Sequence, residues 1–100
     1  MKELLKNINK AFDNKIRLSV MTALLYHSKG LTFNQLKELL GATDGNLSSN
    51  TMVLEDKEYI AIQKIFIKKK PNTTYTVTEK GKNAFSVHLE ALMKIANYKG

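Results

Sequence analysis

The stretch "LTFNQLKELLGATDGNLSSN", residues 31–50, contains two helical segments separated by one short turn. Thr32, with Gln35 three residues later, forms a capping box, which predicts a helix that begins directly after Thr32. Gly41 suits the end of this helix, because glycine adopts a left-handed backbone conformation without strain. Thr43 is a suitable N-cap for a second helix. Two helices joined by so tight a turn form a helix-turn-helix motif.

Two further helices are expected before this motif. Apolar residues at helical spacing predict a short helix over residues 4–12 and a longer one over about 14–28. Asp13 is the expected N-cap of the longer helix, and Gly30 is its expected stop. Apolar side chains lie on two faces of this helix, which is typical of a buried helix.

A β-hairpin and a last helix are expected after the motif. The segments "YIAIQKIFI" (59–67) and "TTYTVT" (73–78) are rich in β-branched and aromatic residues, as strands are. Pro71 and Asn72 between them supply turn chemistry. Helical spacing returns over about residues 79–98. The predicted fold is therefore α+β and mainly helical, with the order α-α-α-β-β-α, an extra short N-terminal helix and a single domain over residues 1–100.

Composition and charge limit the classes of function. The 100 residues include 16 basic and 9 acidic side chains, a net charge of +7, and this surplus favours a polyanionic partner, nucleic acid above all. An acidic protein or a membrane surface would also fit the charge. The absence of cysteine excludes disulfides and thiolate chemistry. No segment is long and apolar enough for a signal peptide or a membrane span, so a cytoplasmic protein is expected.

Three segments together resemble the small winged-helix transcriptional regulators related to the MarR and ArsR families. They are "FDNKIRLSVMTALL" (12–25), residues 31–60 and "KKKPNTTYTVTEKGKNAF" (68–85). The resemblance implies that the helix after Thr43 enters the DNA major groove and that the hairpin, the wing, touches the flanking backbone. It also implies a homodimer built by the terminal helices, here residues 1–12 and 84–98.

The sequence departs from this family pattern at three places. Asn14 stands where a proline is common, and Asn50 with Thr51 replaces a common His-Leu pair. Glu58 stands where a glycine usually ends the recognition helix. The last two departures bear directly on the surface and the end of the helix that would face DNA.

The helix after Thr43 carries the candidate base contacts. Leu47 and Thr51 are the expected inward positions, so Asn46, Ser49 and Asn50 are expected to project outwards. Asparagine can pair bidentately with adenine, and serine can contact any base. An alternative is that these small polar residues only cap a solvated helix.

Other residues are expected to contact phosphates. In the helix-turn-helix motif these are Thr43, Ser48 and Gln35. In the wing they are Lys68, Lys69, Lys70 and Thr73. Residues 64–82 hold six lysines and one glutamate, a net charge of +5, and a charged hairpin tip can reach DNA backbone beyond the recognition helix. The alternative is that the lysines only protect an exposed strand edge.

One feature opposes DNA binding. Residues 43–58 hold four acidic residues and one lysine, a net charge of −3. Only Asp44 lies near the expected groove, because the other acids follow the helix towards its C-terminal end. We expect Arg17, the only arginine, to form a structural ion pair with one of these distal acids.

No catalytic or metal-binding pattern is recognisable. His27 and His88 are expected in the core or at an interface, and too few ligands accompany them for a metal site. The sequence therefore predicts a non-enzymatic, homodimeric regulator that binds double-stranded DNA, acts as a repressor and needs no cofactor. Whether an effector ligand exists stays open. The alternative is a winged-helix module that binds an acidic protein partner through its lysine-rich wing.

Overall fold

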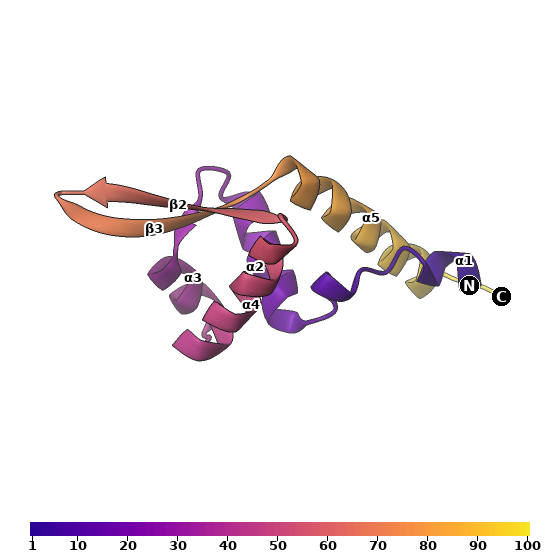
Figure 1. Cartoon of the computed structure of the whole chain (residues 1–100). Helices are drawn as coiled ribbons and strands as arrows, with labels where there is room; N and C mark the ends of the chain where they lie inside the picture. Colours follow the sequence, from indigo (N-terminus) through magenta and orange to yellow (C-terminus); the bar gives the residue numbers. More distant parts are fainter.

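The computed structural model describes all residues, 1–100, and contains five α-helices, one 3₁₀ turn and three strands (Figure 1). Their order is α1 (Lys2–Leu5), η1 (Lys10–Phe12), α2 (Lys15–Tyr26), β1 (Leu31–Thr32), α3 (Phe33–Leu40), α4 (Asp44–Asp56), β2 (Ile60–Ile67), β3 (Lys70–Val77) and α5 (Glu79–Ala96). The sheet is antiparallel with the order β1-β3-β2. The predicted winged-helix architecture is confirmed, and the sequence did not indicate β1 or the separate turn η1.

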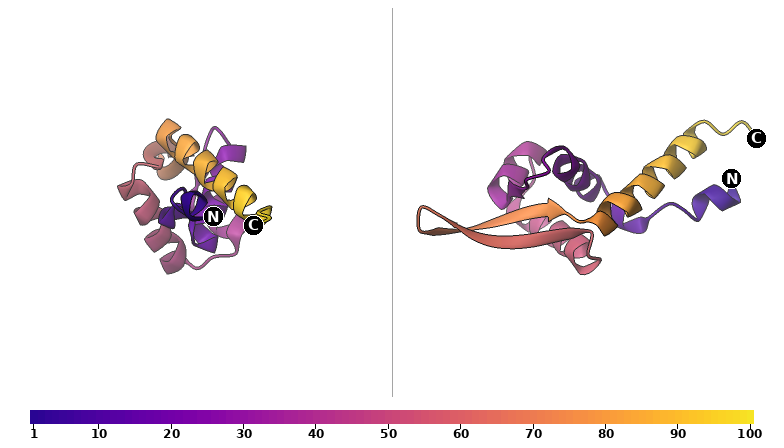
Figure 2. Two further views of the ribbon diagram at one scale, coloured as in Figure 1. Left: turned by 90° about the vertical axis from the view of Figure 1, so that its right-hand side faces the viewer. Right: turned by 90° about the horizontal axis from the view of Figure 1, so that it is seen from above.

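The molecule is elongated, with a helical body between two projections. The β2–β3 hairpin, hereafter the wing, extends from one side of the body, and α5 with α1 extends from the other (Figures 1 and 2). Both termini lie at the α1–α5 end. The overall dimensions are 58 × 26 × 21 Å. The wing and the terminal helices therefore flank the body formed by α2, α3 and α4.

Helix α2 lies at the centre of the core. Its side chains at positions 20, 21 and 24 are inaccessible to solvent, as the apolar residues on both its faces predicted. They pack with fully buried leucines from the two helices of the helix-turn-helix motif, Leu36, Leu47 and Leu54. Full burial of one such side chain contributes about 1.5–3 kcal/mol. This packing holds α3 and α4 on α2 and fixes which face of α4 points outwards.

The predicted caps are present at the start of α3 and in the turn between α3 and α4. Thr32 Oγ1 accepts from Gln35 N at 3.2 Å, and Thr32 N donates to Gln35 Oε1 at 2.8 Å. Gly41 ends α3 with a φ of 63°, in the left-handed region. Thr43 Oγ1 then accepts from Asn46 N at 3.2 Å and begins α4. Local side-chain chemistry therefore determines the helix-turn-helix geometry.

The N-terminal region differs from the prediction. The single helix expected over residues 4–12 is interrupted, because Asn9 is extended and its side chain accepts from Ala11 N at 2.9 Å. Such a side chain competes with the helical backbone and starts a new turn, here η1. The N-cap of α2 is Asn14 and not Asp13, since Asn14 Oδ1 accepts from two backbone N–H groups.

Gly30 is not the stop of α2. The helix ends at Tyr26, and Gly30, with a φ of 96°, leads into β1 beside β3. A side chain there would begin with a Cβ only 2.7 Å from Tyr75 O. Glycine is therefore required by close approach of β3 and by its positive φ.

The wing turn also differs from the prediction. Pro71 and Asn72 pair with Phe66 and Ile65 inside the hairpin and do not form its turn. Lys68 and Lys69 are the two turn residues, with φ of 53° and 66°. A two-residue connection of the type that matches strand twist requires positive φ at both positions. The strand register leaves only these two lysines unpaired, so they adopt it without glycine.

Glu58 occupies the left-handed position that ends α4, with a φ of 62°. Tyr59 N donates to Leu54 O at 2.9 Å, the long-range bond of a Schellman motif. The helix therefore ends as a glycine-terminated helix does, although a glutamate stands at the usual glycine position.

His88 connects the N-terminal segment to α5. Its side chain is 2 % exposed, and its Nδ1 accepts from Asn9 N at 3.0 Å. Phe12 and Phe85 lie against the ring. Burial lowers the pKa of His88 below its ordinary value of 6.5, and the negative charge of Asp13 partly opposes this shift. The hydrogen bond from Asn9 N requires a His88 Nδ1 that carries no proton, so the ring must be neutral.

We predict that the protein loses stability as the pH falls below about 6.5. The unfolded chain binds a proton at His88 more readily than the folded chain, whose pKa is lowered. The free energy of unfolding should therefore be constant above this pH and decrease below it, by at most about 1.4 kcal/mol per pH unit for one group. Urea denaturation between pH 8 and pH 5 measures this.

The matched controls replace each histidine in turn. His88→Gln keeps an acceptor for Asn9 N and should remove the pH dependence. His27→Gln, at an exposed position, should leave it unchanged. An identical slope in the His88→Gln variant would contradict the assignment.

Candidate nucleic-acid interface

The first two turns of α4 present short polar side chains to solvent. Leu47 and Thr51 are buried as predicted, and Asn46, Ser48 and Ser49 are exposed. Ser49 Oγ donates to Asn46 O at 3.1 Å, which leaves its oxygen lone pairs facing outwards. Thr43 Oγ1 accepts from Asn46 N, so its own hydroxyl proton stays available. This surface therefore offers both hydrogen-bond donors and acceptors.

Asn50 does not project outwards, and the prediction that it faces DNA bases is wrong. It is 7 % exposed, and its Oδ1 accepts from Arg17 Nη1 at 2.7 Å. Its Nδ2 donates to both Asn46 O and Asn46 Oδ1 at 2.8 Å. The physical reason is that position 50 borders the inward face, where a buried polar side chain must find partners.

The predicted partner of Arg17 is also wrong. Its guanidinium pairs with none of the distal acids; instead Nε donates to Ala11 O at 2.6 Å and Nη2 to Lys10 O at 3.4 Å. Its third bond is the one to Asn50. The structural role expected for Arg17 is present, but its acceptors are neutral oxygens of η1 and α4.

The remaining phosphate candidates lie at different ends of the motif. Thr43 is the N-cap of α4 and Ser48 lies in its second turn, whereas Gln35 is in the first turn of α3. Gln35 Oε1 is used by the capping box, so only its Nε2 is left to donate. The structure therefore places Thr43 and Ser48 at the start of α4 and Gln35 at the start of α3.

The wing has a basic tip and apolar sides. Lys68, Lys69 and Lys70 are all exposed, and Thr73 is half-buried in β3 opposite Lys64. The hydrophobic residues next to the tip are exposed as well: Ile65 40 %, Phe66 76 % and Ile67 47 %. Sequence reasoning took these residues only as strand formers. The sequence did offer one signal: β2 has more apolar residues than the part of it that packs on the body requires.

The acidic residue nearest the start of α4 is paired. Asp44 Oδ1 lies 2.7 Å from Lys37 Nζ, and both side chains are exposed. Such an exposed pair contributes little to stability. It does place a positive charge beside the one carboxylate that would oppose a phosphate. Glu55 and Asp56 lie three turns away, at the other end of α4.

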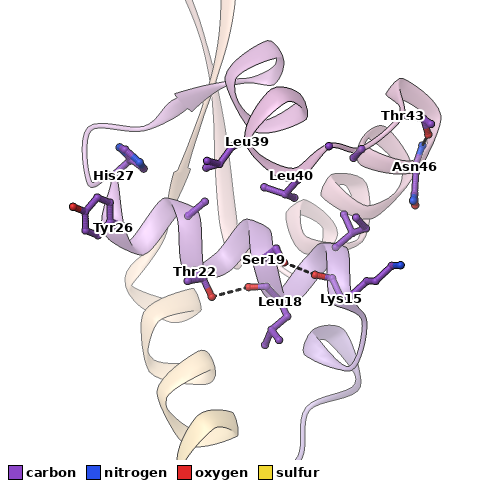
Figure 3. A pocket seen from close by; sticks show the side chains of 14 residues that line it. Lys15, Leu18, Ser19, Thr22, Tyr26, His27, Leu39, Leu40, Thr43 and Asn46 are labelled. Atoms are coloured by element: carbon purple, nitrogen blue, oxygen red, sulfur yellow. Dashed lines mark hydrogen bonds between the residues drawn. The ribbon is translucent and has the colours of Figure 1, made fainter.

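A groove of about 860 Å³ runs between α2, α3 and the first turn of α4 (Figure 3). Thr43 and Asn46 lie at one end and Tyr26 and His27 at the other. The hydroxyls of Ser19 and Thr22 donate to backbone oxygens of their own helix. A molecule bound in this groove would therefore contact the same turn of α4 that carries Asn46.

No group of three or more His, Asp or Glu side chains is placed to hold a metal ion. None of the helices combines the length and the apolar character that crossing a bilayer requires.

The chain belongs to the family described as the winged helix DNA-binding domain, whose model matches residues 16–96. This confirms the resemblance of residues 12–25, 31–60 and 68–85 to small winged-helix regulators. The solved structures that share the fold include a regulator of the ArsR family.

Two similar proteins cover nearly the whole chain. An uncharacterised protein of Methanocaldococcus jannaschii is 33% identical over 87 residues, which are 87% of this chain and 94% of the relative. A transcriptional regulator homologue from Pyrococcus horikoshii superposes with a TM-score of 0.86 at 28% identity, covering 97% of this chain and 96% of the other. YodB of Bacillus subtilis shares the fold at a TM-score of 0.77 and 18% identity, covering 90% and 87%.

We predict that Asp44→Asn increases the affinity for random duplex DNA. The substitution removes the carboxylate at the start of α4 and releases Lys37 to contact a phosphate. The log–log salt slope should then steepen by about 0.9 per subunit. Fluorescence anisotropy at several salt concentrations measures both quantities. Asp56→Asn is the control, and an equal gain in this distal variant would indicate a general effect of net charge.

Proposed function

We propose that the protein is a transcriptional regulator that binds double-stranded DNA as a homodimer and represses transcription. The observation that carries the proposal is the exposed surface of the first two turns of α4, which is polar and rich in hydrogen-bonding groups and whose one carboxylate, Asp44, is paired with Lys37. Asn46 and Ser49 would read bases in the major groove, and Thr43 and Ser48 would contact phosphates. The free backbone N–H groups at the start of α4 would also favour a bound phosphate there.

The wing would bind the backbone beside the recognition helix. Lys68, Lys69 and Lys70 are exposed point charges on a turn, which suits phosphates and not base edges. Thr73 and Gln35 could add polar phosphate contacts from β3 and α3. Base recognition would thus belong to α4, and most contacts with the DNA backbone would belong to the wing.

The homodimer would form through residues 1–12 and 84–98. Helix α5 leaves the body and carries four large, exposed apolar side chains, Val87, Leu89, Leu92 and Met93. Leu5 of α1, which lies beside α5, is 57 % exposed. A patch of this kind is typical of a protein interface. Two copies would present two α4 helices to a pseudo-palindromic operator, and occupancy of that operator would block transcription.

The dimer is tested by sedimentation equilibrium at micromolar concentration. We expect twice the chain mass of 11.3 kDa. The double substitution Leu92→Lys with Met93→Lys should give a monomer, because it places charges on the exposed face of α5. Leu39→Lys, at an apolar position exposed on α3, is the control and should stay dimeric. A monomeric wild-type protein would refute this part of the proposal.

DNA binding by the wing is tested by replacing Lys68, Lys69 and Lys70 together with alanine. Affinity for operator and for random duplex should fall alike. The log–log salt slope should decrease by about 0.9 for each lysine that had neutralised one phosphate. Lost affinity at an unchanged slope would mean that the lysines act in some other way.

A second candidate function is a protein-interaction module that binds an acidic partner. The exposed Phe66, Ile65 and Ile67 beside the lysines favour it, because apolar and basic groups together suit an amphipathic protein surface. The two functions differ in the binding of random duplex DNA at two salt concentrations. A steep decrease in affinity with salt supports DNA binding, and no binding supports the protein partner.

A further inference from the structure

A chain of hydrogen bonds runs from α2 to the exposed face of α4. Arg17 Nη1 donates to Asn50 Oδ1 at 2.7 Å, and Asn50 Nδ2 donates to Asn46 Oδ1 at 2.8 Å. The same Nδ2 also donates to Asn46 O at 2.8 Å. Since Asn50 is 7 % exposed, its amide depends on these protein partners and not on water.

The chemistry of Arg17 fixes the direction of this chain. The oxygen and nitrogen of an amide are told apart by their hydrogen-bond partners. A guanidinium can only donate, so the oxygen of Asn50 must face Arg17. The NH₂ group of Asn50 must then face Asn46, which has to offer its oxygen in return. The NH₂ group of Asn46 is consequently the part of this side chain left for an outside partner.

We infer that Arg17 and Asn50 are positioning residues that hold Asn46 with its NH₂ group towards the DNA. Asn46 then recognises a hydrogen-bond acceptor on a base edge, such as O6 or N7 of guanine or O4 of thymine. The inference rests on the proposed role of α4 in the major groove. It replaces the bidentate pairing with adenine, which would need both amide atoms at the base edge, whereas Oδ1 of Asn46 is turned back to Asn50.

The first experiment identifies the base pair that Asn46 reads. A preferred duplex is selected with the wild-type protein, and Asn46→Ala is titrated against single-pair variants of it. Preference should disappear at one base pair, where the wild-type protein discriminates roughly 5- to 150-fold. If the base is guanine and N7 is the acceptor, 7-deazaguanine, which lacks N7 but keeps the pairing with cytosine, should weaken DNA binding by the wild-type protein and leave binding by Asn46→Ala unchanged.

Two isosteric substitutions then test the direction of the chain. Asn46→Asp replaces the outward NH₂ group with an oxygen, so the preference at this pair should change to a base with an amino group, cytosine or adenine. Asn50→Asp can still accept from Arg17 but can no longer donate to Asn46. The amide of Asn46 should turn, and the preference should change in the same direction, although residue 50 contacts no DNA.

A merely structural role for Asn50 would weaken binding to all duplexes equally, without any change of base. Should Asn50→Asp fail to fold, Asn46→Asp decides alone, since its site is exposed. The inference is overturned if wild-type preference requires a base amino group, if Asn46→Ala loses no preference, or if Asn46→Asp retains the wild-type base. Wild-type binding to random duplex with a steep salt slope would show that DNA binding itself still holds; its absence would refute the proposed function as well.

Discussion

The guanidinium of Arg17 connects η1 and α2, which are neighbours in sequence, to α4, in which its partner Asn50 lies 33 positions away. It extends from α2, donates to the backbone oxygens of Lys10 and Ala11 in η1, and donates to the side chain of Asn50 in α4. The apolar core positions α4 on α2, but only directional bonds of this kind can fix how a polar side chain is presented. Arg17 therefore holds both the side chain of Asn50 on α4 and the backbone of η1 in the N-terminal segment.

This connection also links the terminal helices to the helical body. The segment held by Arg17 continues from Asn9, whose backbone N–H donates to His88 on α5. The surface proposed for dimerisation and the surface proposed for base reading are therefore joined through η1 by hydrogen bonds. The wing stands apart from this path, because its tip is held only by the pairing of β2 with β3. The start of α4, held by Arg17 and Asn50, suits the recognition of bases, and the more independent wing suits contacts with phosphates.

The sequence predicts best those features that local chemistry determines. The capping box at Thr32, the glycine that ends α3 and the cap at Thr43 each depend on residues within one turn, and all three are present. The hairpin and α5 were also predictable from residue type and spacing. The wing turn was not, because the register of two strands, and not the presence of Pro71, decides which residues remain unpaired. The orientation of Asn50 was not predictable either, since its partner Arg17 lies 33 positions away, and helical spacing alone places residue 50 at the border between the inner and outer faces.

In the proposed complex, DNA lies against the first two turns of α4 and the tip of the wing. Backbone amide chemical shifts of the isotope-labelled protein, recorded by NMR during titration with its selected duplex, test this most directly. The largest changes should occur at residues 43–49 and 68–70, with little change at residues 55–58 of the acidic end of α4. Changes confined to the wing, or centred on residues 55–58 while residues 43–49 stay unaffected, would contradict it.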